Sequence, residues 1–227
     1  MKKYFRQAYL DNKNFWNKKR LSLLAESLGL LAIALIIQKV ADVYVGYLKG
    51  TYVPDLLLDH LPTVDLDFFI VQGALILTFV IIFLLLVKPR YFSFTIKALA
   101  LFIITRSFFI SLTHLGVSPR QLPLDTDSIG FSLYNWLYNS SGDFFFSGHT
   151  GTPYLMALIF WHEKLWRRFF LTCSIIFGIS VLLAKIHYSI DVFAAPFMTY
   201  GIYTIAKTVF RKDFAQTHDK RALKINS

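Results

Sequence analysis

The fold class is decided by residues 66–87, which read LDFFIVQGALILTFVIIFLLLV. Asp67, near the start, is the only charged residue in this stretch. A helix that crosses the hydrocarbon core of a membrane needs about 20 consecutive apolar residues, and this segment supplies them. The sequence therefore predicts a membrane-spanning helix here.

Further apolar segments lie on both sides of this one, at residues 22–45, 91–113, 143–161, 166–186 and 189–208. The segment 143–161 reaches spanning length only if its helix begins near Asp143, because His162-Glu163-Lys164 closes it. We therefore expect an all-α fold, a six-helix transmembrane bundle over residues 22–208. A basic segment, 1–21, precedes it and a basic tail, 209–227, follows.

The net charge of +10 is distributed as in a membrane protein. Most of the 24 Lys and Arg residues lie before the first span, after the last, or in alternate connections. The positive-inside rule then predicts that both termini are cytoplasmic, which requires an even number of spans. Nucleic acid is not an expected partner, since no groove-reading motif accompanies the charge. With no cleavable signal peptide or preceding soluble domain recognised, we expect a bacterial inner membrane.

Candidate catalytic residues fall at the outer ends of the last three spans. His149 lies in SGDFFFSGHT, residues 141–150, and HYSID, residues 187–191, holds His187 and Asp191. The i, i+4 spacing of His187 and Asp191 predicts that both side chains share one helical face. The carboxylate can then orient the imidazole, whose other nitrogen can attack phosphorus, while His149 acts as general acid. The plainer alternatives are a helix–helix hydrogen bond for each histidine and a helix cap for Asp191.

These motifs resemble the second and third motifs of the type 2 phosphatidic acid phosphatase superfamily, and SGDFFFSGHT with HYSID resembles its sphingomyelin synthase branch most. PDLLLDH at residues 54–60, and Arg106 with Thr113 and Pro119 downstream, are weaker matches to the same branch. The resemblance implies that His187 is the nucleophile, Asp191 orients it, and His149 serves as acid and then base. It also implies a six-helix bundle with an outward-facing site and no metal or other cofactor.

The sequence departs from the superfamily pattern where phosphate is usually bound. The superfamily has an Arg six residues before the nucleophilic His, where this chain has Val181, and the chain has no Arg-Pro pair. Arg106 and Lys185 are therefore the candidates to meet the phosphate charge. Asp143 matches the synthase motif and is a further substrate-site candidate, with helix capping as its alternative role. The aromatic run 131–138 is expected to lie along the membrane surface.

The expected function is transfer of a phospho-headgroup from a phospholipid to a lipid acceptor of the ceramide or diacylglycerol type, in phospholipid or sphingolipid metabolism. A lipid phosphate phosphatase or phospholipase C-like hydrolase of the same superfamily uses water instead. Three other interpretations remain: a proton-coupled transporter that uses the His/Asp cluster, a metal site built from His149, His187, Asp143 and Asp191, and a non-catalytic scaffold. The sequence does not indicate the oligomeric state.

Overall fold

The computed structural model describes residues 18–48, 50–113, 115–138 and 144–217. Within these residues every regular element is helical, apart from one isolated bridge between Thr51 and Leu115, so the predicted all-α class is confirmed there. The helices are α2 (Lys18–Tyr47), η1 (Phe68–Gln72), α3 (Gly73–Val87), η2 (Pro89–Tyr91), α4 (Phe92–Leu112), α5 (Phe131–Tyr138), α6 (Gly148–Ile159), α7 (Lys164–Leu183), α8 (Ser189–Val209) and α9 (Arg211–Thr217).

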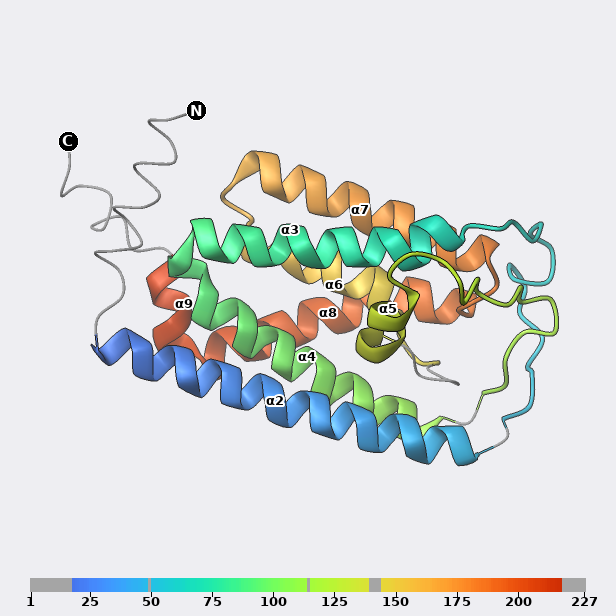
Figure 1. Cartoon of the computed structure of the whole chain (residues 1–227), viewed down its shortest axis with the longest axis horizontal. Coiled ribbons are helices and arrows are strands. Elements are labelled where there is room, and N and C mark those ends of the chain that lie inside the picture. Colours follow the sequence, from blue (N-terminus) through green and yellow to red (C-terminus); the bar gives the residue numbers. More distant parts are fainter. Residues whose placement is uncertain (1–17, 49, 114, 139–143, 218–227) are drawn as a thin grey trace.

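The long helices form an elongated bundle (Figure 1). They run between two ends of the bundle. One end, which we call the α9 end, holds α9, the start of α2 and the end of α8. The connections through residues 50–66 and 115–130 lie at the other, which we call the loop end. Helix α6 packs against both α7 and α8, and α2 packs along α4. The start of α2, the first long helix of the described chain, and the end of α8, the last one, therefore lie at the same end of the bundle.

Four helices are long and apolar enough to cross a membrane: Leu21–Tyr47, Phe68–Val87, Pro89–Leu112 and Lys164–Leu183. They correspond to the first, second, third and fifth predicted spans, and they are compatible with a multi-pass membrane protein. The fourth and sixth predicted spans also form helices, α6 and α8, but these do not meet the same length and hydropathy criteria. The six-span count and the sides of the two termini remain predictions.

The prediction that the fourth helix begins near Asp143 is wrong, because α6 begins at Gly148. Residues 144–147 are not helical, and Ser147 is the N-cap, with its Oγ accepting a hydrogen bond from the Thr150 amide at 3.3 Å. Helix α6 has 12 residues and is thus about 18 Å long. That is shorter than the roughly 30 Å hydrocarbon core of a membrane. His149 consequently lies in the first helical turn.

An ion-pair cluster joins α2, α4 and α9 at the α9 end; Lys97 and Asp213 are buried in it, and Glu26 is exposed. Lys97 on α4 is 2% exposed, and its Nζ lies 2.7 Å from Glu26 Oε1 and 3.0 Å from Asp213 Oδ2. Ser93 donates a hydrogen bond of 2.6 Å to the other oxygen of Asp213. A buried charge that loses its partner is strongly destabilising, so this cluster fixes where the first and last helices meet.

Lys97→Met is expected to lower the free energy of unfolding by about 3–5 kcal/mol, because it leaves the Asp213 carboxylate buried beside an apolar side chain. The measurement is thermal or denaturant unfolding of the purified protein in detergent. The matched control is the double variant Lys97→Met/Asp213→Asn, in which no unpaired charge remains and part of the stability returns. A single variant as stable as the wild type would contradict this role.

Candidate active site

The structure brings the two candidate histidines together at the loop end. His149 comes from the first turn of α6, and His187 lies just before α8. Their ring centroids are 6.1 Å apart, with an angle of 65° between the ring planes. The backbone between them is tied, since the amide of Ser147 donates a 2.9 Å hydrogen bond to the carbonyl of Asp191. The start of α6 and the first turn of α8 are therefore held as one unit.

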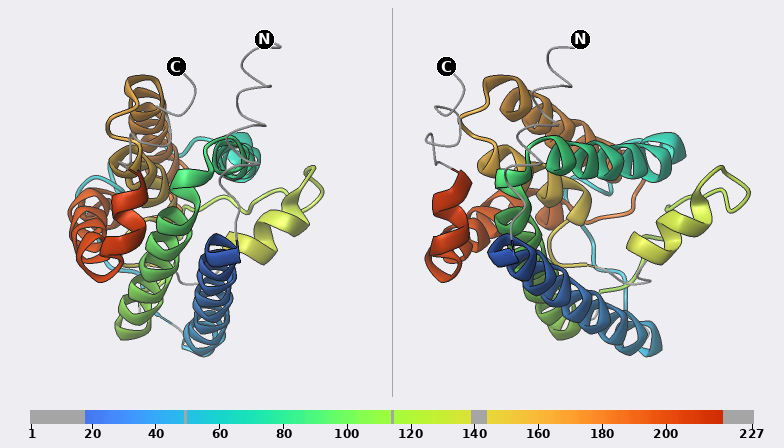
Figure 2. Two further views of the ribbon diagram at one scale, coloured as in Figure 1. Left: turned by 90° about the vertical axis from the view of Figure 1, so that its left-hand side faces the viewer. Right: turned by 60° about the vertical axis from the view of Figure 1, so that its left-hand side comes forward.

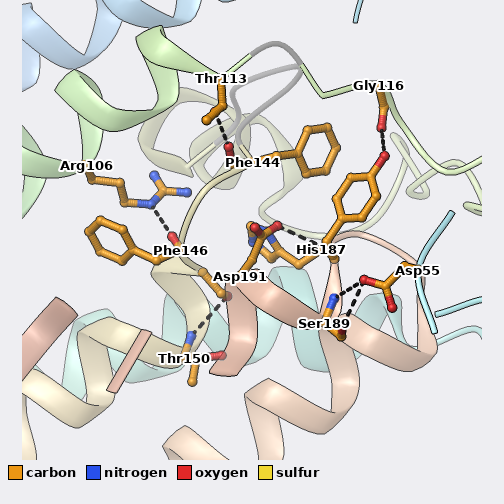
Figure 3. Close-up of polar contacts among 12 residues, drawn as sticks. Asp55, Arg106, Thr113, Gly116, Phe144, Phe146, Thr150, His187, Ser189 and Asp191 are labelled. Carbon is orange, nitrogen blue, oxygen red and sulfur yellow. Dashed lines mark hydrogen bonds and ion pairs between the residues drawn. The ribbon is translucent and has the colours of Figure 1, made fainter. Parts of the chain in front are cut away.

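Asp191 contacts His187 as the spacing predicts, but the two side chains do not share the face of one helix. His187 Nδ1 lies 3.3 Å from Asp191 Oδ2, and both side chains are buried (Figure 3). His187 is not on a helical face, however, because α8 begins only at Ser189. The carboxylate reaches back over the helix start, where the same oxygen accepts a 3.0 Å hydrogen bond from the Tyr188 amide. Asp191 thus caps α8 and orients the imidazole at once, which leaves Nε2 of His187 as the nitrogen opposite the carboxylate.

His149 lies against an aromatic cluster that sequence reasoning assigned to the membrane surface. Tyr134 on α5 is buried, and its hydroxyl is 3.2 Å from His149 Nε2. The ring of Tyr138, one turn later on α5, stacks on the His149 ring with centroids 6.0 Å apart. Phe177 of α7 packs on His149 as well, at 6.2 Å. The i, i+4 spacing of the two tyrosines is the sequence signal that could have indicated one inward-facing side of α5.

Tyr134→Phe is expected to lower kcat about tenfold, because a lost hydrogen bond near 1.4 kcal/mol corresponds to that factor. It should also displace the limb of the pH–rate profile that belongs to His149, since the hydroxyl contacts its Nε2. Tyr138→Phe is the matched control: its hydroxyl bonds Thr78 instead, while its ring still stacks on His149. Equal pH profiles for the two variants would contradict a role for Tyr134 in orienting His149.

Arg106 reaches the start of α6 from α4. Its Nε donates a 3.1 Å hydrogen bond to the Phe146 carbonyl (Figure 3). The guanidinium also lies over Gly148, where an added Cβ would come within 3.3 Å of Arg106 Cζ. From the end of the same helix, Thr113 donates a 2.6 Å hydrogen bond to the Phe144 carbonyl. Arg106 therefore lies beside the turn that carries His149, as a phosphate-binding role requires, and it also supports that turn.

Of the other two predicted substrate-site residues, the structure describes Lys185 alone, and it contacts a different part of the loop end. Lys185 is 1% exposed, and its Nζ donates hydrogen bonds to the carbonyls of Leu58 and Leu61, the latter at 2.7 Å. Its ammonium thus holds the 55–61 loop, and its role in binding phosphate stays a prediction. Asp143 lies outside the described residues.

Asp55, from the PDLLLDH segment, anchors the start of α8. Its Oδ2 accepts 2.8 Å hydrogen bonds from both the amide and the hydroxyl of Ser189 (Figure 3), and its Oδ1 accepts from the amides of Leu57 and Leu58. Burial opposes ionisation of this carboxyl, but these hydrogen bonds outweigh it and hold the pKa of Asp55 below its usual value. The sequence marked this motif without revealing its role, which is to fix the turn between His187 and α8.

The Asp55 carboxylate is expected to make the protein less stable in acid. Its pKa is lowered in the folded state, so its stabilisation is fully present above the unfolded pKa, about 3.9, and is lost as the pH falls through the folded value. The measurement is the melting temperature between pH 7 and pH 3. Asp55→Asn should melt lower at pH 7 and show a smaller acid-dependent fall, whereas Asp65→Asn, in the same connection, should follow the wild type. Parallel pH curves for Asp55→Asn and the wild type would contradict this.

A metal site receives no support from the part of the chain that the structure describes. Within residues 18–48, 50–113, 115–138 and 144–217, no three His, Cys, Asp or Glu side chains are grouped so as to hold a metal ion. Asp143, the fourth ligand of the metal interpretation, is outside these ranges.

The family comparison covers the segment that holds the two histidines and the carboxylate. The family described as PAP2 superfamily C-terminal matches residues 140–208, a range that contains His149, His187 and Asp191. Within that range the chain is similar to the type 2 phosphatidic acid phosphatase superfamily. No curated protein and no solved structure gives a significant match. The match supports a phosphatase-type enzyme acting on lipid phosphoesters, and it does not distinguish the sphingomyelin synthase branch from the others.

Proposed function

We propose that this protein is a membrane phosphotransferase that moves a phospho-headgroup from a phospholipid to a lipid hydroxyl through a phospho-histidine. The observation that carries the proposal is the pairing of His149 with His187, at 6.1 Å between ring centroids, with Asp191 on Nδ1 of His187. A single phosphate can contact both rings at that separation. The sequence motif SGDFFFSGHT favours the transferase over the hydrolase.

In the first half-reaction, Nε2 of His187 attacks phosphorus and the bond between phosphorus and the oxygen of the leaving lipid breaks. Protonated His149 donates its proton to that oxygen, so the lipid part of the donor leaves as a neutral alcohol. Asp191 accepts the Nδ1–H of His187 and stabilises the positive charge that develops on the ring. Arg106, at the start of α6, is the proposed partner of the phosphate oxygens. Catalysis of this kind depends on positioning and charge stabilisation.

In the second half-reaction, neutral His149 removes the proton from the acceptor hydroxyl. The acceptor oxygen attacks phosphorus, the nitrogen–phosphorus bond breaks, and His187 returns to its starting state. Burial of His187 and Asp191, at 3% and 0% exposed, favours a lipid acceptor over water. The positive-inside distribution of Lys and Arg supports a site that faces outward, and we propose the bacterial inner membrane as its location.

The test supplies a phospholipid labelled in its headgroup phosphate to the protein in mixed micelles, with ceramide or diacylglycerol added in separate reactions. The expected result is label in a new lipid that depends on one of the two acceptors and is absent with His187→Gln. Label released only as free phosphate or phospho-alcohol would favour the hydrolase. Headgroup turnover that never occurs, together with solute flux in proteoliposomes that His187→Ala abolishes, would favour the transporter.

A further inference from the structure

One connection of the loop end holds the chain on both sides of His187. Figure 2 shows the 50–66 connection, in cyan, crossing the end of the bundle between α2 and α3. Its residues 53–64, which we call the 53–64 segment, bind the stretch 183–189, where α7 ends and α8 begins. The contacts are the Val64 amide with the Leu183 carbonyl at 3.0 Å, the Lys185 ammonium with the carbonyls of Leu58 and Leu61, the Val53 amide with the Tyr188 hydroxyl at 3.2 Å, and the Asp55 carboxylate with the amide and hydroxyl of Ser189.

The backbone just before His187 has an unfavourable conformation. Among the residues that the structure describes, Lys185 is the one position other than glycine with a positive φ, 61°. This left-handed conformation is unfavourable for a residue with a Cβ, and it persists where surrounding contacts determine it. It lets the chain turn back on α7, since the amides of Ile186 and His187 both reach the Val181 carbonyl, at 3.0 and 3.4 Å. The position of His187 therefore depends on a turn that needs support from outside.

The Lys185 side chain provides this support by binding the 53–64 segment. Residues 55–61 form a turn within the segment. Asp55 Oδ1 accepts hydrogen bonds from two amides at the start of this turn, and the buried Lys185 ammonium donates to two carbonyls toward its end. A negative charge at the amide end and a positive charge at the carbonyl end match the partial charges of such a turn. The other oxygen of Asp55 holds the start of α8, so the turn is bound on both sides of His187.

We propose that Lys185 and the 53–64 segment position His187 for its attack on phosphorus. Asp191 sets the rotation of the imidazole by contacting Nδ1, whereas the segment sets the place of the backbone from which the ring extends. Lys185 is thus a positioning residue that acts through His187. The inference rests on the proposed function for the role of His187, and extends it by naming what directs Nε2 toward the phosphate.

The first test measures kcat and KM of Lys185→Met, which removes the ammonium and keeps an unbranched side chain. We expect kcat to fall about 10–100-fold, because a displacement of about 1 Å at a reacting atom can cost about 100-fold in rate. KM for the phospholipid donor should change little. A donor with a p-nitrophenyl leaving group, which needs no proton, should show the same fall in kcat, since the impaired step is the attack by His187.

Asp55→Asn separates positioning from phosphate binding. A carboxylate repels phosphate, so a lower kcat in this variant cannot come from lost phosphate binding. The double variant Lys185→Met/Asp55→Asn should lose less than the product of the two single effects, because both residues act through one segment. A raised KM with unchanged kcat for Lys185→Met, or a double loss equal to that product, would give Lys185 a separate role such as phosphate binding and overturn the inference.

Lys88→Met is the matched control, and Tyr188→Phe is a further test variant. Lys88 also joins two parts of the chain, since it pairs with Glu163 at 2.7 Å, but it lies beside η2 at the α9 end. Its variant should keep the wild-type kcat. Tyr188→Phe removes the hydroxyl that binds the Val53 amide, and it decides the question if Lys185→Met does not fold. An unchanged kcat in Tyr188→Phe would then overturn the inference.

The second test needs no substrate, so it separates failure of this inference from failure of the proposed function. Protein labelled with ¹⁵N in its histidines is studied by NMR in detergent micelles, below the melting temperature of each variant, and His187→Gln assigns the His187 signals. Lys185→Met should shift or broaden the Nδ1 signal of His187, and Lys88→Met should leave it unchanged. Identical His187 signals in Lys185→Met and the wild type would overturn the inference. Altered signals in a protein that never transfers a headgroup would support the positioning of His187 and count against the proposed function.

Discussion

His187→Gln is expected to lower headgroup transfer by about 10⁴-fold or more, to the background of the assay. Glutamine can keep a hydrogen bond near Asp191, but its amide has no nitrogen lone pair able to attack phosphorus. Loss of a covalent nucleophile removes a whole pathway, which is why the expected effect is far larger than that of a supporting contact. The measurement is the initial rate of transfer of a labelled headgroup at saturating donor.

The control for this variant is His60→Gln. His60 is exposed in the 50–66 connection, where its Nδ1 contacts the Leu56 carbonyl, and it does not contact the site. It should retain full activity, and both variants should melt within a few degrees of the wild type. Transfer by His187→Gln at more than about a hundredth of the wild-type rate would contradict a nucleophilic role.

His149→Asn is expected to lower transfer by about 10²–10⁴-fold, the usual contribution of a general acid–base residue. Asparagine keeps a polar side chain at this position, and the rings of Tyr134 and Tyr138 stack on each other independently of residue 149, so the aromatic cluster should survive. What is lost is the proton for the leaving alcohol. The rate should also lose the limb of its pH dependence that reports this group.

A donor whose leaving group needs no proton separates this role from a structural one. With a p-nitrophenyl ester of the headgroup phosphate, His149→Asn should form the phosphorylated protein at a rate close to that of the wild type. With a natural phospholipid the same step should be slow. An equal loss with both donors would show that His149 supports the fold or binds phosphate, and would contradict its assignment as the acid.

The features that could be predicted from sequence are those set by local pattern. The apolar stretch at residues 66–87 forms the predicted helix because composition alone decides it, and α7 and α8 lie close to their predicted ranges. The contact between His187 and Asp191 follows from their separation of four residues, although the helix begins later than the spacing implied. The lengths of the predicted spans allow His149 and His187 to lie at the same depth, but they do not determine the distance between them.

The features that could not be predicted depend on contacts between distant parts of the chain. The start of α6 is fixed when the Ser147 amide bonds the Asp191 carbonyl of another helix, which no local propensity encodes. The carboxylate of Asp55 caps Ser189, which lies 134 positions later. From sequence, Tyr134 is expected to be an aromatic residue at the membrane surface; only the packing of α5 shows its contact with His149. The contacts of Lys185 with two carbonyls could not be predicted either, because these carbonyls are in a loop whose path the sequence leaves open.

The most direct test of the central claim is to trap the covalent intermediate. The protein is mixed with a phospholipid labelled with ³²P in its headgroup, quenched within milliseconds to seconds in denaturant, and digested for peptide mapping. The account predicts base-stable, acid-labile label on the peptide that contains His187, greater in amount when no acceptor is supplied and absent from His187→Gln. Label on a different residue, or rapid headgroup transfer with no labelled protein at any time, would contradict it.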